Sequence, residues 1–240
     1  MDKRFAVLID ADNVSDKYIK PLLDEISNDG VITYKRIYGD WTRPALSSWK
    51  QVLLNYSITP IQQYNYTQGK NSTDSAMIID AMDILHSGSV DGFAIVSSDS
   101  DFTRLAARLR ESGMYVVGMG EKKTPNPFIA ACNRFVYLEN LGQTQQADAP
   151  KQDEGEAAVS VKVIRNTIAT IIDEISDDDD GWANLSEVGN ILLKRYPSFD
   201  VRSYGFTKLT PFIKSLGMFE LYSVPSEKGN VRVMYVRRKT

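Results

Sequence analysis

Phe5-Ala6-Val7-Leu8-Ile9-Asp10 is the stretch that decides the fold, because five apolar residues in a row end in an acid. A short, continuous apolar run is typical of a strand that is buried on both faces of a parallel sheet. Comparable strands are predicted at 31–38, 93–97, 115–119 and 135–138, with an edge strand at 59–64. Helices are predicted between them, at about 16–27, 44–55, 73–86, 102–111 and 126–133. This alternation predicts an α/β domain with a parallel sheet covered on both faces.

The composition restricts the chemistry that the chain can perform. Its 240 residues carry 28 Lys and Arg against 31 Asp and Glu, a formal net charge of −3. One cysteine, Cys132, excludes an intramolecular disulfide and a cysteine-based zinc cluster, and one histidine, His86, excludes a His-rich metal site. If the protein is an enzyme, its chemistry therefore rests mainly on carboxylates. No apolar run approaches the roughly 20 residues of a membrane span, so we expect a cytoplasmic protein without membrane contact.

Two domains and a linker are expected. Residues 1–141 form the α/β domain, and residues 142–158 lack large apolar side chains, which predicts a flexible linker. Residues 159–240 predict three helices and a β-hairpin, an arrangement that resembles a winged helix-turn-helix. Asn184-Leu-Ser-Glu187 is expected to cap the second of these helices, and Trp182 and Phe199 are expected in the core.

Aspartates follow two of the predicted strands. Asp10 and Asp12 come after the first strand, Asp99 and Asp101 come after the fourth, and Asp74 begins a helix. Ligands bind outside the carboxyl ends of parallel strands where the strand order reverses, so neighbouring strands would bring these acids into one cleft. Clustered carboxylates favour a bound cation, and oxygen ligands without His or Cys suit Mg²⁺ or Mn²⁺. Each acid alone is also a common helix cap, so the metal prediction depends on the strand order.

The acids also match a known family in order and spacing. Ile9-Asp10-Ala11-Asp12-Asn13, then Ser72-Thr73-Asp74, then Ser97-Ser98-Asp99-Ser100-Asp101-Phe102 resemble the NYN domain of the PIN-like nuclease superfamily over about residues 3–141. The resemblance implies an α/β/α sandwich with a mainly parallel sheet and a metal-dependent ribonuclease. It also implies site residues: the catalytic, metal-binding acids Asp10, Asp74, Asp99 and Asp101, and the pocket residues Asp12, Asn13 and Ser98, with Asn13 placed to orient Asp10 or a water molecule.

The second domain resembles another family. Gly181-Trp182-Ala-Asn-Leu185-Ser186, Asp200-Val-Arg202-Ser-Tyr204-Gly205-Phe206 and Lys208-Leu209 are similar to a LOTUS (OST-HTH) domain over about residues 160–240. The resemblance implies RNA binding or, in some members, a protein partner such as an RNA helicase. Residues 159–240 carry 12 basic and 10 acidic side chains, and four of those acids form the run 177–180. Without that run the segment has 12 basic side chains against 6 acidic ones, an excess that suits a polyanion.

Basic residues beside aromatic ones mark candidate RNA contacts on the first domain. Lys35, Arg36 and Arg43 flank Tyr38 and Trp41, and Lys70 precedes Asp74. Such residues hold a single strand by phosphate contact and base stacking, although a solvated surface explains each of them equally well.

The leading hypothesis is a Mg²⁺- or Mn²⁺-dependent ribonuclease that hydrolyses single-stranded or structured RNA, and we expect an endonuclease. The alternative is a non-catalytic RNA-binding regulator that uses the same cleft. A third hypothesis is a phosphatase of the haloacid dehalogenase type, which Asp10-Ala11-Asp12 resembles, although Asn13-Val14 follows where that family tends to have Gly or Thr.

Overall fold

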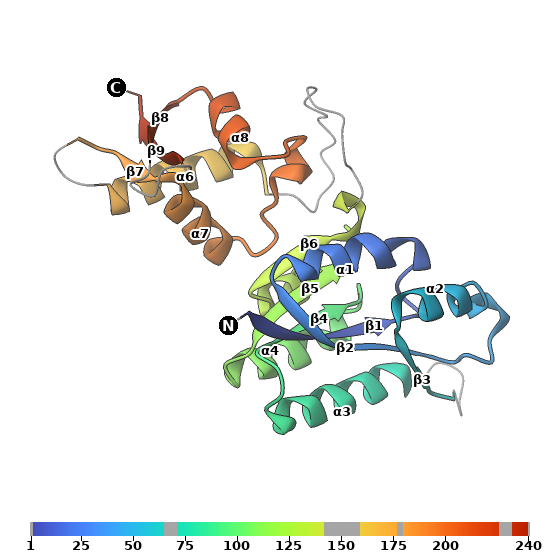
Figure 1. Cartoon of the computed structure of the whole chain (residues 1–240). Coiled ribbons are helices and arrows are strands. Elements are labelled where there is room, and N and C mark those ends of the chain that lie inside the picture. The colour runs from blue at the N-terminus through green and yellow to red at the C-terminus, as the bar shows by residue number, and fades with distance from the viewer. Residues whose placement is uncertain (1, 65–71, 142–158, 177–179, 226–231, 240) are drawn as a thin grey trace. The chain divides into compact units, whose positions relative to one another are not determined.

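The computed structural model describes residues 2–64, 72–141, 159–176, 180–225 and 232–239. The chain divides into two compact units, residues 1–142 and 143–240, and each is described by itself (Figure 1). The predicted linker at 142–158 lies outside the described residues. No helix within the described ranges is long and apolar enough to cross a membrane.

The first unit is built on a six-stranded sheet with the order β3-β2-β1-β4-β5-β6. Its strands are β1 (Lys3–Asp10), β2 (Gly30–Gly39), β3 (Thr59–Gln62), β4 (Gly92–Val96), β5 (Tyr115–Gly120) and β6 (Arg134–Tyr137). Its helices are α1 (Ile19–Ser27), α2 (Trp49–Tyr56), α3 (Ser72–Ser87), α4 (Thr103–Glu111) and α5 (Asn126–Ala131), with short 3₁₀ turns η1 (Asp16–Tyr18), η2 (Pro44–Leu46), η3 (Ser100–Phe102) and η4 (Leu138–Asn140). Every strand pair is parallel, so the α/β prediction is confirmed and the sheet is wholly parallel.

The strand order reverses between β1 and β4. Strands β1, β2 and β3 follow one another toward one edge of the sheet, and β4 then pairs with the opposite side of β1. Ile9 is the register partner of Val96, so the residues that follow β1 and β4 lie side by side. Such a reversal is the place where open α/β sheets bind ligands, outside the carboxyl ends of their strands.

The two faces of the sheet are covered by different helices (Figure 1). Val7 and Ile9 pack in one core cluster with side chains of α1 and α2. Because strand side chains alternate between faces, Asp10 points to the opposite face. Its register partner, Tyr38, donates a hydrogen bond to Asp80 of α3. Asp10 therefore lies on the face that α3 covers.

The second unit combines three helices with an antiparallel sheet of order β7-β9-β8. Its elements are α6 (Val161–Ile175), β7 (Ala183–Asn184), α7 (Leu185–Arg195), the 3₁₀ turn η5 (Val201–Tyr204), α8 (Leu209–Ser215), β8 (Phe219–Pro225) and β9 (Arg232–Arg238). The predicted helices and hairpin are confirmed, and β7 adds a third strand that the sequence did not reveal.

Asn184 caps α7 as expected, because its side chain accepts a hydrogen bond from the Ser186 amide at 2.9 Å. Phe199 is a core residue, also as expected. The prediction for Trp182 was wrong, since this side chain is half-buried and its ring packs on Tyr222. The neighbouring Ala183 turns into the core, so strand alternation points Trp182 the other way.

Candidate metal centre

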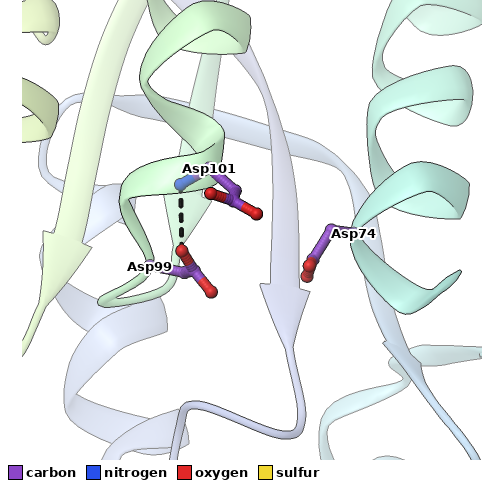
Figure 2. A group of neighbouring side chains, drawn as sticks. All are labelled: Asp74, Asp99 and Asp101. Atoms are coloured by element: carbon purple, nitrogen blue, oxygen red, sulfur yellow. Dashed lines mark hydrogen bonds between the residues drawn. The ribbon is translucent and has the colours of Figure 1, made fainter. Parts of the chain in front are cut away.

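Three aspartates from two separate segments meet at the carboxyl edge of the parallel sheet. Asp99 and Asp101 lie on the turn after β4, and Asp74 lies in the first turn of α3. Each offers one carboxylate oxygen, and these oxygens all lie within 4.8 Å of one another (Figure 2). Asp74 and Asp99 are half-buried, whereas Asp101 is exposed. We call Asp74, Asp99 and Asp101 the acidic cluster.

The turn after β4 is held by its own side chains. Asp99 is the N-cap of η3, and its Oδ1 accepts a hydrogen bond from the Asp101 amide at 2.9 Å. The Asp99 amide in turn donates to the hydroxyl of Ser97 at 3.1 Å. The capping role that the sequence offered as an alternative is therefore confirmed for Asp99, whereas Asp101 lies inside η3. The cap coexists with the acidic cluster because capping engages one oxygen of a two-oxygen group.

The clustering of negative charge shows in the pKa of Asp74, which is raised from 3.8 to about 6. Burial contributes most to this increase, followed by the charges of Asp10, Asp99, Asp101 and Asp12. A carboxylate that is poorly hydrated and surrounded by like charges holds its proton more tightly. A cation bound at the same place would remove this cost.

Asp10 is not a member of the acidic cluster. Its side chain is 1% exposed, and Oδ2 accepts hydrogen bonds from Asn13 Nδ2 at 2.6 Å and from the Ser97 hydroxyl at 2.8 Å. Oδ1 accepts the Asp12 amide at 3.0 Å. Burial raises the pKa of Asp10, and the bonds from Asn13 and Ser97 oppose that increase. Asp10 thus joins the ends of β1 and β4, while its role as a metal ligand stays a prediction.

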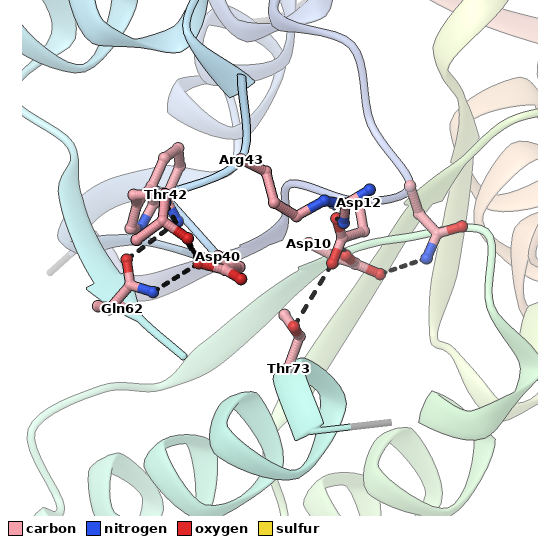
Figure 3. Close-up of polar contacts among 9 residues, drawn as sticks. Asp10, Asp12, Asp40, Thr42, Arg43, Gln62 and Thr73 are labelled. Atoms are coloured by element: carbon pink, nitrogen blue, oxygen red, sulfur yellow. Dashed lines mark hydrogen bonds and ion pairs between the residues drawn. The ribbon is translucent and has the colours of Figure 1, made fainter. Parts of the chain in front are cut away.

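Asp12 lies beside Asp10 and is engaged by a cation (Figure 3). Arg43 Nη1 lies 2.6 Å from Asp12 Oδ1 in an ion pair, and the Thr73 hydroxyl is 3.4 Å from Oδ2. The Arg43 side chain is half-exposed. This ion pair places a guanidinium next to the acids, where a phosphodiester substrate would need a counter-charge.

The loop that carries Arg43 follows β2 and is held by Asp40 (Figure 3). The Asp40 carboxylate accepts hydrogen bonds from the Thr42 hydroxyl at 2.6 Å and from Gln62 Nε2 at 2.9 Å. Gln62 belongs to β3, and its other amide atom, Oε1, accepts the Trp41 amide at 2.9 Å. The position of Arg43 is therefore set by contacts between β2 and β3.

Two of the other predicted RNA contacts, Lys35 and Arg36, are engaged within the unit. Lys35 Nζ donates to the backbone carbonyl of Tyr56 at 2.5 Å, and the Arg36 guanidinium is paired with Asp80. Lys70 lies outside the described residues. Of the described candidates, Arg43 is the one that the structure places beside the predicted site. RNA contact stays a prediction for all four.

Ser98 and Ser97 have different partners, although they are neighbours in the sequence. Ser98, a predicted pocket residue, is buried, and its hydroxyl accepts the Glu121 amide at 2.8 Å, which ties the end of β4 to the end of β5. Ser97, which the sequence analysis missed, bridges Asp10 and Asp99. The strand register could have revealed this role. Ile9 is the register partner of Val96, so the residues that follow them, Asp10 and Ser97, lie side by side. That signal exists only once β1 and β4 are known to be neighbours.

The donor set of the acidic cluster fits a hard divalent cation. It consists of carboxylates alone, the ligand type that Mg²⁺ and Mn²⁺ prefer over imidazole or thiolate. Burial, together with the negative charges of Asp10, Asp99 and Asp101, raises the pKa of Asp74, so ionising this carboxyl is unfavourable without a counter-ion. Both observations are consistent with a metal-binding site formed by Asp74, Asp99 and Asp101.

Comparison with protein families matches residues 4–139 to the NYN domain, which is more than half of the chain. The chain belongs to the NYN family. Its NYN domain is followed by an OST-HTH/LOTUS domain, matched over residues 159–231. Both resemblances drawn from the sequence are confirmed, and the acidic cluster lies within the matched NYN domain, a PIN-like nuclease domain.

Two solved structures are similar to parts of the chain. A crystal structure of a protein of unknown function, VPA0982 from Vibrio parahaemolyticus RIMD 2210633, is 18% identical and covers 57% of this chain and 93% of its own, with a TM-score of 0.48. A solution NMR structure of an uncharacterized protein from gene locus NE0665 of Nitrosomonas europaea is 28% identical and covers 42% of this chain and 93% of its own, with a TM-score of 0.30. No curated protein matches the chain.

Proposed function

We propose that the protein is a Mg²⁺- or Mn²⁺-dependent ribonuclease that hydrolyses RNA phosphodiester bonds at the acidic cluster, and that it cuts within the strand. The observation that supports this proposal most directly is the meeting of three carboxylate oxygens within 4.8 Å in an NYN domain. The position of the cluster, at the reversal of strand order, adds to it.

The acidic cluster and the residues around it have different roles in this proposal. Asp74, Asp99 and Asp101 would hold the cation, which when bound supplies an activated water and neutralises charge on the phosphodiester. Ser97 and Asn13 hold the Asp10 carboxylate in one orientation through bonds of 2.8 and 2.6 Å. Because Asp10 is buried and fixed, its negative charge strengthens the attraction of the site for a cation without adding a mobile group.

Arg43 supplies the complementary charge for the substrate. Its guanidinium lies 2.6 Å from Asp12, an ion pair for which a substrate phosphate would compete. We further propose that the LOTUS domain holds RNA or a partner protein for the nuclease domain.

Arg36, another predicted RNA contact, has a structural role. Its ion pair with Asp80 helps to pack α3, the helix that carries Asp74, against β2.

The test uses purified full-length protein and end-labelled single-stranded RNA with Mn²⁺, Mg²⁺ or EDTA. Asp99→Asn removes one charge of the acidic cluster, and Asp83→Asn is the matched control, because Asp83 is an exposed aspartate of the same helix as Asp74. We expect wild type and Asp83→Asn to cleave in either metal and Asp99→Asn to lose cleavage. Internal fragments that carry a 5′-phosphate and a 3′-hydroxyl would identify an endonuclease.

Two outcomes would contradict the proposal. Cleavage that persists in EDTA or in Asp99→Asn would show that the acidic cluster is not the catalytic site. Binding of RNA without cleavage in any metal would support the alternative, a non-catalytic RNA-binding regulator that uses the same cleft.

A further inference from the structure

A second loop borders the acidic cluster, on the side of the sheet away from Arg43. It consists of residues 121–124 and lies between β5 and α5. The sheet order β2-β1-β4-β5 places the loop that carries Arg43 at one end of this series and residues 121–124 at the other, with the ends of β1 and β4 between them. We call residues 121–124 the β5 loop.

The β5 loop is held against the end of β4. The Glu121 amide donates to the buried hydroxyl of Ser98 at 2.8 Å. Gly120, the last residue of β5, allows the close approach, because a Cβ there would lie 2.6 Å from the Ser97 carbonyl oxygen. Asp99 follows Ser98 directly, so the β5 loop lies next to the turn that carries two acids of the cluster.

The two lysines of the β5 loop have different surroundings. The Lys122 amide donates to Glu139 Oε1 at 2.9 Å, which fixes the backbone, while the Lys122 side chain is exposed. Lys123 Nζ lies 2.7 Å from Glu121 Oε2 in an ion pair. Lys122 forms no such ion pair with the residues that the structure describes. Of these two neighbours, Lys122 is therefore the one whose charge is available to a ligand.

Positive charges thus flank the acidic cluster along the carboxyl edge of the sheet. Arg43 follows β2 and pairs with Asp12, and Lys122 follows β5 (Figure 3 shows the Arg43 side). Neighbouring strands lie about 4.8 Å apart, so β2 and β5, which are three spacings apart, are separated by about 14 Å. A short stretch of single-stranded RNA is long enough to cross this distance. Its phosphates would then meet a cation on each side of the acids.

We propose that Lys122 binds a phosphate of the RNA substrate, and that the strand runs along the carboxyl edge of the sheet from Arg43, across the acidic cluster, to Lys122. The inference rests on the proposed function, since it places the scissile phosphodiester at the acidic cluster and the flanking phosphates on the two cations. Contacts between basic side chains and phosphates fix the register of a nucleic acid without reading its sequence. Lys122 is accordingly a substrate-binding residue and not a metal ligand.

The test measures binding of a fluorescein-labelled single-stranded RNA by the full-length protein in EDTA, with fluorescence anisotropy at several KCl concentrations. Each phosphate contact with a single strand contributes about 0.7 to the slope of log Kd against log salt, so Lys122→Ala should lower this slope by about 0.7. Its Kd at low salt should rise by about two- to fivefold, the range for an exposed ion pair. Arg43→Ala should have an effect of similar size, and the two effects should multiply in the double variant, because the two cations contact different phosphates. In Mn²⁺, kcat/KM for RNA cleavage should fall by a similar factor in each variant.

Lys123→Ala is the matched control, because it removes the same charge from the same loop and Lys123 is already paired with Glu121. It should change Kd by less than about twofold. Thermal melts would show that each variant is folded.

Three outcomes would overturn the inference. One is an unchanged Kd, salt slope and kcat/KM in Lys122→Ala. Another is an equal loss in Lys122→Ala and Lys123→Ala, since that would indicate a general effect of net charge. The third is a wild-type protein that binds no RNA. Binding that depends on Lys122 without any cleavage would refute the ribonuclease proposal and support the course of the strand, whereas cleavage that is the same in wild type and Lys122→Ala would do the opposite.

Discussion

Replacing Asp74 with asparagine tests whether the acidic cluster is under electrostatic strain in the metal-free protein. The pKa of Asp74 is raised from 3.8 to about 6, which at about 1.36 kcal/mol per unit corresponds to at most about 3 kcal/mol. The side chain is only half-buried, so solvent screening reduces this to about 1–2 kcal/mol. Coulomb's law brackets that range, since two charges 4.8 Å apart repel by about 0.9 kcal/mol in water and about 3.5 kcal/mol at an effective dielectric of 20.

The dipole of α3 opposes the stability that Asp74→Asn would gain. Asp74 lies in the first turn of α3, where a negative charge stabilises the helix by about 0.3–1 kcal/mol. We therefore expect Asp74→Asn to raise the free energy of unfolding by about 1 kcal/mol in EDTA at pH 8, measured by urea denaturation. Asp83→Asn, which removes an exposed charge from the same helix, should change it by less than about 0.5 kcal/mol.

The pH dependence of this difference has a definite sign. The pKa of Asp74 is higher in the folded protein than in the unfolded chain, so the folded state binds this proton more tightly. The stability that the protonated group contributes is fully present below about pH 3.8 and is lost as the pH rises through about 6. The advantage of Asp74→Asn should therefore be small below about pH 4, about half of its full size near pH 5 and full at pH 8.

Adding metal should make wild type more stable than Asp74→Asn, the reverse of the order expected in EDTA. A cation at 100 times its Kd stabilises the folded state by about 2.7 kcal/mol, and wild type should gain more of this than Asp74→Asn. A variant that is less stable than wild type in EDTA at pH 8 would refute the reasoning. So would a difference that is the same at pH 5 and pH 8.

Three further predictions concern single side chains. Ser97→Ala removes the hydroxyl that bonds both Asp10 and the Asp99 amide. RNA cleavage should therefore fall about 10–100-fold at saturating metal, and unchanged cleavage would contradict the positioning role. Arg43→Ala should raise KM more than it lowers kcat, because it removes a phosphate contact and leaves the acidic cluster intact; a steady-state assay in which only kcat changes would contradict this. Burial raises the pKa of the Cys132 thiol to about 12, so Ellman's reagent at pH 8 should react with it only after unfolding in urea, and rapid reaction of the folded protein would show that the thiol is accessible.

Much of the fold follows from local pattern. The apolar run that ends at Asp10 and the alternation of strands with helices predict the parallel sheet, and the elements occur where they were expected. The hairpin of the second unit follows in the same way, but β7 does not, because two residues are too few to form a recognisable pattern. The prediction of Trp182 as a core residue was wrong for a related reason. The direction of its side chain depends on which face of the sheet Ala183 of β7 occupies.

The candidate site was predictable in its residue types and only partly in its arrangement. Asp99 and Asp101 are two residues apart on one turn, so their proximity is a local property that the sequence determines by itself. The meeting of these acids with Asp74 depends on α3, which packs against β1 and β2, and is decided by tertiary structure.

Tertiary structure also decided which charged groups are engaged. Asp10 lies outside the acidic cluster, with Oδ2 bonded by Asn13 and Ser97 and Oδ1 by the Asp12 amide. Arg36 pairs with Asp80, which lies 44 residues further along the chain in α3. Propensity and alternation act over a few residues, so the sequence by itself determined the strands, the helices and the acids at the strand ends. The choice of a partner for a charge depends on which distant elements pack together and exclude water, and that is settled only when the whole domain is folded.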